Sequence, residues 1–172
     1  AQQHRIRPRK MLPSGVLPNL ARKIGEDLQM EVGRAMSVWG DGGWSEKVRE
    51  GKYLDEFFSD DLVAEATRLI TSRWQPTPAP EWVTAVPSPR RPELVAGFAQ
   101  RLADSLGLPY LEVLSYKAPP EEQKSMHNSA MQFLNIYTNL TVNTSVVQAG
   151  PVLLVDDMVD SSWTLTVCAA AL

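Results

Sequence analysis

Four consecutive apolar residues at positions 152–155 lead directly into two acids, Asp156 and Asp157. This feature constrains the fold most, because a short continuous apolar run is typical of a strand that is buried on both faces, as in a parallel sheet. Open α/β sheets bind their ligands at the carboxyl ends of such strands. The run therefore predicts an α/β fold with two carboxylates at the ligand-binding edge of its sheet.

A polar loop follows the two acids and runs into a predicted helix. The loop carries Asp160, Ser161 and Ser162, and Thr164 opens the helical pattern. Backbone N–H groups at a helix N-terminus bind anions, and paired carboxylates bind ribose hydroxyls or a hydrated Mg²⁺. The segment is therefore suited to binding a sugar phosphate at both ends. The plainer alternative is a strand that ends in solvated acids and is followed by a capped helix.

Strand and helix patterns alternate from residue 82 onward. We predict strands over 82–86, 110–116, 140–147 and 152–155, and helices over 92–106, 121–136 and 164–172. This order implies an α/β core with a mainly parallel sheet and helices on both faces. We expect residues 152–155 to form an interior strand of that sheet.

The chain divides into three parts. Residues 1–18 are predicted to be a basic extended arm or linker, because their X-Pro pairs favour extended backbone. Residues 19–75 are predicted to be a helical region that packs on the core, since apolar residues recur at helical spacing over 20–39 and Ser59 is a good N-cap. Residues 81–172 form the α/β core. The last helical pattern continues to the final residue, so we expect a core truncated at its C-terminus in a piece of a longer protein.

Basic residues gather at the start of the chain, in a segment without acids. A basic arm of this kind binds the phosphate backbone of DNA, and the plainer interpretation is a solvated connector. The whole chain has 20 acidic residues against 17 lysines and arginines, so the concentration of positive charge is local. The basic residues of the segment are Arg5, Arg7, Arg9, Lys10, Arg22 and Lys23.

Several classes of protein are excluded by composition. A single cysteine, Cys168, supports neither a disulfide framework nor a zinc site, and His4 and His127 are too far apart to suggest a metal site. No apolar run is long enough to span a membrane, and the first residues do not resemble a secretory signal. These features predict a cytoplasmic protein.

Two sets of segments resemble known families. Residues 152–164 resemble the phosphoribosyl-pyrophosphate loop of type I phosphoribosyltransferases, and residues 86–91, 97–100 and 123–135 are similar in order and spacing to the ComF-like branch. The second set resembles the C-terminal region of bacterial RecQ-type ATP-dependent DNA helicases, where a phosphoribosyltransferase-like domain follows the helicase core. Its members lie at 39–44, 48–52, 82–88 and 160–166.

The resemblance implies a role for each matching residue. Asp156 and Asp157 would bind the ribose hydroxyls and a Mg²⁺, and Asp160 would be the catalytic, proton-handling acid. The residues implied around the 5′-phosphate are Asp160, Ser161, Ser162, Trp163 and Thr164. Those implied at the pyrophosphate are Ser88, Arg90, Arg91 and Lys117.

The sequence also departs from the family. The family usually has Gly at the position of Ser162 and a small residue at Trp163, so the ligand has less room here. No helicase motif is present, and no nucleobase-binding hood is recognisable. We therefore expect a sugar-phosphate-binding domain of a DNA helicase or DNA-processing protein, with weak or lost transferase activity. The expected partners are phosphoribosyl pyrophosphate or another sugar phosphate, the helicase core, and DNA through the arm.

Two other functions share features of this sequence. The alternative is an active Mg²⁺-dependent phosphoribosyltransferase that uses phosphoribosyl pyrophosphate, and the intact acids and hydroxyls favour it. A receiver domain, whose first strand also ends in paired acids, is excluded by position. Such a domain needs its phosphoacceptor strand further downstream, and 15 residues follow Asp157.

Overall fold

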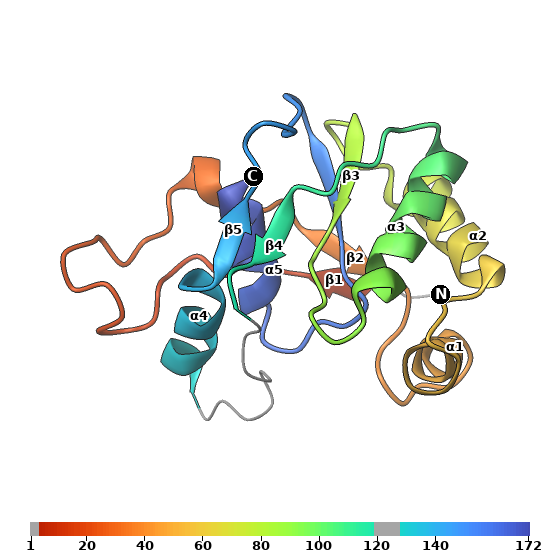
Figure 1. Ribbon diagram of the computed structural model, residues 1–172, viewed down its shortest axis with the longest axis horizontal. Helices are drawn as coiled ribbons and strands as arrows, with labels where there is room; N and C mark the ends of the chain where they lie inside the picture. The colour runs from red at the N-terminus through yellow and green to blue at the C-terminus, as the bar shows by residue number, and fades with distance from the viewer. Residues whose placement is uncertain (1–3, 119–127) are drawn as a thin grey trace.

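The structure is a computed structural model that describes residues 4–118 and 128–172. At its centre lie two parallel strands, β3 (Trp82–Ala85) and β6 (Val152–Val155), paired along their full lengths (Figure 1). The predicted parallel strand at 152–155 is therefore confirmed. Its expected interior position is wrong for the described residues, because β6 pairs with β3 alone and the remaining strands are paired elsewhere.

The other side of β3 meets the segment that leads into β4 (Leu114–Tyr116). The Leu111 N–H donates to the Val83 carbonyl at 3.0 Å, and residues 83 and 110 form a parallel bridge. Strand β4 then pairs antiparallel with β5 (Leu140–Val142). The protein is thus a mixed helix-and-sheet structure with a small parallel sheet, and the expectation of a mainly parallel sheet is not met.

The antiparallel pairing follows from where helix α4 (Ser129–Tyr137) ends. The Lys117 N–H donates to the Asn139 carbonyl at 2.8 Å, so the residues after α4 lie beside the end of β4. Strand β5 therefore starts where β4 ends and runs back along it, whereas a parallel strand needs a crossover to the opposite end. Part of the predicted helix over 121–136, residues 121–127, lies outside the described residues.

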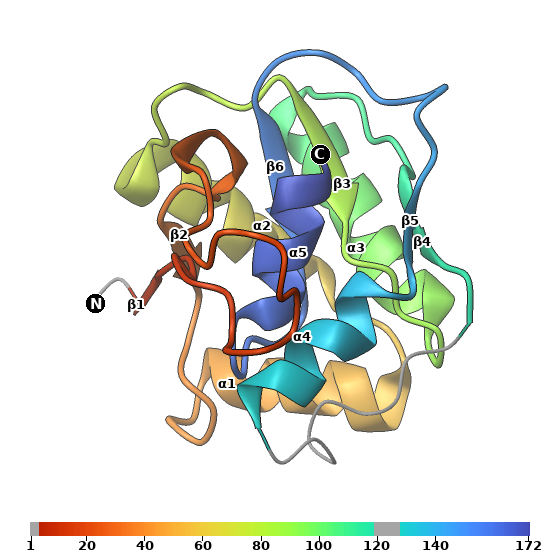
Figure 2. The ribbon, with the colours of Figure 1, turned by 90° about the vertical axis from the view of Figure 1, so that its left-hand side faces the viewer.

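Helices cover both faces of the β3–β6 pair, as Figures 1 and 2 show. On one face, α2 (Asp60–Arg68) and α3 (Pro92–Leu106) pack their apolar residues against the strands. Helix α5 (Trp163–Ala171) lies on the other face, where Cys168 is fully buried. Two apolar layers therefore stabilise the parallel pair, in agreement with its continuous apolar sequence.

Residues 4–39 contain no α-helix. Strand β1 (His4–Ile6) pairs antiparallel with β2 (Gly33–Ala35), and the short 3₁₀ turn η1 (Glu26–Leu28) lies between them. The predicted helix over 20–39 is wrong. The backbones of this segment and of the arm bond to each other, for instance from Ile24 N–H to the Lys10 carbonyl at 2.9 Å. Leu20, Leu28 and Val32 remain exposed, so their helical spacing forms no buried face.

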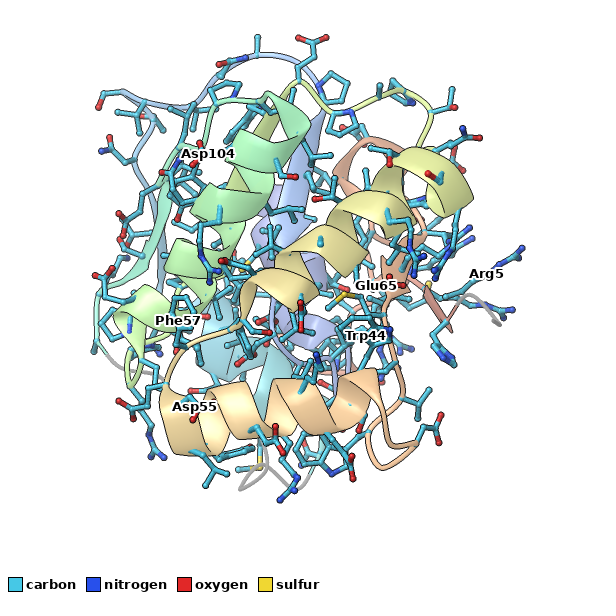
Figure 3. The ribbon with its side chains drawn as sticks, turned by 90° about the vertical axis from the view of Figure 1, so that its right-hand side faces the viewer. Arg5, Trp44, Asp55, Phe57, Glu65 and Asp104 are labelled. Atoms are coloured by element: carbon cyan, nitrogen blue, oxygen red, sulfur yellow. The ribbon has the colours of Figure 1, made fainter. Side chains whose placement is uncertain are left out.

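Four short elements connect β2 to β3: α1 (Trp44–Glu50), the π-helical turn η2 (Gly51–Asp55), α2, and a second π-helical turn, η3 (Leu69–Trp74). Helix α1 and η2 run on into each other and cross below α2 and α3 (Figure 3). A Cβ at Gly51 would lie 2.7 Å from the ring of Phe58, so a glycine is required for this close packing. The crossing places η2 near the carboxyl end of β6.

Candidate functional site

The two loops that the sequence singles out leave the same edge of the sheet. Residues 156–162 follow β6, and residues 86–91 follow β3. The Val86 N–H donates to the Val155 carbonyl at 2.8 Å, which fixes the two strand ends side by side. The structure thus brings the acid loop and the predicted pyrophosphate loop to one edge, because their strands are parallel neighbours.

Asp156 is half-buried at the end of β6. Its Oδ1 accepts the backbone N–H of Asp157 at 2.8 Å. Burial, and then the negative charge of Asp157, raise the pKa of Asp156 well above its usual range. The Asp156 charge in turn contributes to the raised pKa values of Tyr116 and Cys168, after burial of those groups. Asp156 is therefore easier to protonate than an ordinary aspartate.

Asp157 lies in an ion pair with a residue that sequence reasoning did not identify. Its Oδ2 lies 2.7 Å from Nζ of Lys52, and the side chains of Lys52 and Asp157 are only 18% and 12% exposed. Lys52 also contacts the sulfur of Met158 at 3.3 Å. Lys52 is the last residue of segment 48–52, one of the segments that resemble the helicase family. Nothing else in the sequence distinguishes it from other lysines in a helical pattern.

Tyr53 connects the acid loop to Arg91. Nζ of Lys52 lies 5.8 Å from the centre of the Tyr53 ring, and Cζ of Arg91 lies 5.5 Å from it. The Arg91 side chain also approaches Glu56, with Nε 3.5 Å from Oε1. Arg91 and Lys52 therefore both lie beside the Tyr53 ring. Arg90 is exposed on the same loop.

The other predicted pyrophosphate residues lie farther along the sheet edge. Ser88 lines a hollow of about 210 Å³ beyond the ends of β3 and β4, together with Pro87, Glu112 and Tyr116. Neither aspartate of the acid loop lines this hollow. The Lys117 side chain is exposed at the end of β4. The predicted pyrophosphate set is thus spread along the edge rather than gathered in one cavity.

The second half of the acid loop is held by the N-terminal arm. Nε of Arg9 donates to the Ser161 carbonyl at 2.8 Å, and Cζ of Arg9 lies 5.3 Å from the centre of the Trp163 ring. Figure 2 shows the arm passing in front of α5. Trp163 is 2% exposed and packs edge-on against Phe133, so its indole lies in the core rather than over the loop. Its Nε1 is buried without a hydrogen-bond partner.

The turn into α5 has an unusual backbone. Ser162 has φ +65°, in the left-handed region where glycine is favoured. This conformation gives a physical reason for glycine at that position. Asp160 is exposed, whereas Ser161 and Thr164 are half-buried around the first turn of α5. The N–H groups of a first helical turn have no intrahelical acceptors and favour an anion.

The residues do not fit a Mg²⁺ ion as they stand. Asp156 and Asp157 are the expected ligands, but an ammonium group already contacts Asp157, and burial disfavours the charged form of Asp156. A divalent cation at Asp157 would lie beside the Lys52 charge, and like charges at such short range repel strongly. Among the described residues no three His, Cys, Asp or Glu side chains form a metal-binding group.

No family model, no curated protein and no solved structure matches this chain. Within the described part of the chain, no helix has the length and apolar character needed to cross a membrane. A function can therefore be based on the geometry of the site and on the resemblance of its segment to the phosphoribosyl-pyrophosphate loop.

Proposed function

We propose that the chain is a phosphoribosyltransferase-like, sugar-phosphate-binding domain of a DNA helicase or DNA-processing protein, with weak or lost transferase activity. One observation carries the proposal. The parallel strand β6 ends in two acids and continues through a left-handed Ser162 directly into α5. This arrangement supports binding of a sugar phosphate, because it places carboxyl oxygens and a helix N-terminus at the two ends of one loop.

Each end of the loop would contact a different part of the ligand. Asp157 and Asp156 offer oxygens to the sugar hydroxyls. The first turn of α5, with the hydroxyls of Ser161 and Thr164, would bind the phosphate through N–H and O–H groups. Arg91, which lies beside the Tyr53 ring as Lys52 does, would supply a positive charge on the neighbouring loop.

Weak or lost transferase activity is supported by the same contacts. Transfer from phosphoribosyl pyrophosphate needs a cation on the pyrophosphate and an acid that handles a proton. Asp157 is paired with Lys52, and Asp160 is exposed to water on a loop. The active alternative has one observation in its favour, since Ser88 and Arg91 leave the same sheet edge as the acids.

Calorimetry on the full chain tests this function. We expect ribose 5-phosphate to bind, and the double change Ser161→Ala with Thr164→Val to weaken binding about tenfold, through the loss of two hydroxyl contacts. The matched control is Thr71→Val, which removes the exposed hydroxyl of a threonine remote from the loop and should leave affinity unchanged. Absence of binding by the wild-type chain would refute the proposal. Release of pyrophosphate from phosphoribosyl pyrophosphate with a nucleobase would establish the active alternative.

Binding of DNA through the arm is a separate part of the proposal. Arg9 is engaged with α5, but Arg5, Arg7 and Lys10 are exposed, and Figure 3 shows Arg5 pointing away from the body of the protein. Replacing these three residues with alanine should reduce the slope of log affinity against log salt by about 3, because each neutralised phosphate contact contributes about one counterion. An unchanged slope would make the arm a structural segment only.

A further inference from the structure

The Lys52–Asp157 pair is built into the fold rather than formed by two mobile surface side chains. Lys52 belongs to η2, whose first residue, Gly51, packs so closely on Phe58 that no Cβ would fit. Both charged side chains are mostly buried, and their atoms are 2.7 Å apart. By contrast, the Lys47–Asp61 pair has a similar separation of 2.6 Å but side chains that are 43% and 67% exposed.

A second fixed cation stands close to the first. Arg91 and Lys52 both lie within 6 Å of the Tyr53 ring centre, at 5.5 and 5.8 Å. Tyr53 also directs its hydroxyl toward the sulfur of Met158 at 3.9 Å. Two cations therefore lie beside the Tyr53 ring, Lys52 paired with Asp157 and Arg91 with Glu56.

We propose that the ammonium group of Lys52 takes the place of a divalent cation at Asp157, so that the site binds a metal-free sugar monophosphate rather than a Mg²⁺-bound diphosphate. This inference rests on the proposed function. A lysine ammonium supplies one positive charge and three donors, which serve sugar oxygens and Asp157 together. A Mg²⁺ ion placed at Asp157 would lie beside the ammonium group of Lys52 and be repelled by it.

Titration of Mg²⁺ alone, without a sugar phosphate, tests whether Lys52 occupies the place of a divalent cation at Asp157. We expect the wild-type chain to bind Mg²⁺ no more tightly than about 1 mM, and Lys52→Met to bind it at least about tenfold more tightly, because Asp157 then lacks its cation. Lys47→Met is the matched control and should behave as wild type. The carboxyl NMR signal of Asp157 reports where Mg²⁺ binds. If the wild-type chain binds Mg²⁺ at Asp157 with a dissociation constant below about 1 mM, the proposal is wrong, whatever the variants show.

Titration of ribose 5-phosphate tests the ligand class. In EDTA and in Mg²⁺ the wild-type affinity should agree within about twofold, whereas Lys52→Met should lose about tenfold in EDTA and regain it in Mg²⁺. Lys52→Arg keeps the charge and should remain independent of metal, which covers the case in which Lys52→Met does not fold. A requirement for Mg²⁺ in the wild type overturns the inference. If ribose 5-phosphate binds in no condition, the proposed function is wrong. The Mg²⁺ titration still tests the role of Lys52 in that case, because it uses no sugar phosphate.

Discussion

The two halves of the loop between β6 and α5 are each held by a cation from earlier in the chain, but in different ways. Lys52 forms a mostly buried ion pair with Asp157 in the first half. Arg9 donates to the backbone carbonyl of Ser161 in the second half and stacks on Trp163. One contact neutralises a side-chain charge, and the other fixes the path of the backbone.

This difference separates two properties of the site. Replacing Lys52 changes the charge that a ligand or metal meets, whereas replacing Arg9 changes where the loop amides lie. The second half also depends on the core, because Trp163 is buried against Phe133 directly after the loop. We therefore expect substitutions in the second half to act on stability and geometry, and those in the first half to act on electrostatics.

The largest effect should come from Trp163→Ala. Loss of an indole that is 2% exposed leaves a cavity beside Phe133, so the free energy of unfolding should fall by about 4 kcal/mol. Urea denaturation measures the change. Trp39→Ala, which removes an indole that is 52% exposed, is the control and should cost under about 1 kcal/mol. Equal effects of the two changes would mean that the second half of the loop is not anchored in the core.

The next largest effect is a difference in stability between variants of Asp157 and Asp156, the two acids of the first half. Asp157→Asn leaves Lys52 mostly buried without its partner, and should lower the free energy of unfolding by about 2 kcal/mol, between the values for surface and buried pairs. Asp156→Asn keeps an oxygen for the Asp157 N–H and removes a carboxyl group whose ionisation favours the unfolded chain, so it should raise stability at neutral pH. Chemical denaturation at pH 7 distinguishes the two, and changes of the same sign would contradict the assignment.

The pH dependence follows from the raised pKa of Asp156. Because this pKa is higher in the folded than in the unfolded chain, folding favours the protonated form. The contribution is complete below the unfolded pKa of about 4 and is lost as the pH rises through the folded pKa. The stability of the wild type relative to Asp156→Asn should therefore decline over that range. The same pH dependence in both chains would contradict a raised pKa of Asp156.

The sequence contained enough to predict the first half of the loop in part. The continuous apolar run at 152–155 predicted a parallel strand, because such a run is typical of strands that are buried on both faces. The two acids follow the run directly, so they lie at the end of that strand. Lys52 could not be predicted in the same way. Its contact with Asp157 depends on how η2 crosses the core, and no local pattern encodes a contact between residues 105 positions apart.

The failed prediction of a helix over 20–39 has a related cause. Apolar residues at helical spacing form a helix only when the core covers their common face, and here Leu20, Leu28 and Val32 stay exposed. The backbone of this segment bonds to the arm instead, through Leu12, Ile24 and the β1–β2 pair. Tertiary pairing over long range therefore decided the structure of both the arm and the segment that it holds.

A smaller effect is expected for the contact of the arm with the loop. Arg9→Ala removes an exposed hydrogen bond to Ser161 and the stacking on Trp163, so stability should fall by about 1 kcal/mol. Hydrogen exchange of the amides at 157–162 should become faster, because the carbonyl of Ser161 is no longer held. The neighbouring Lys10→Ala is the control, since its side chain is exposed. Unchanged exchange in Arg9→Ala would show that the arm does not fix the loop.

The smallest effect concerns the backbone at Ser162. At φ +65° a serine is strained, and a glycine is not, so Ser162→Gly should raise the free energy of unfolding by roughly 0.5–1 kcal/mol despite the greater freedom of glycine in the unfolded chain. Ser161→Gly is the matched control, because Ser161 is not among the described residues with positive φ; it should lower stability by a similar amount. Thermal unfolding of both variants measures the difference. If Ser162→Gly also raises the affinity for ribose 5-phosphate, the Cβ of Ser162 limits the approach of the phosphate to the loop amides. If stability rises and affinity does not, the strain at Ser162 affects only the start of α5. The affinity for the sugar phosphate then depends on the charge of Lys52 in the first half of the loop.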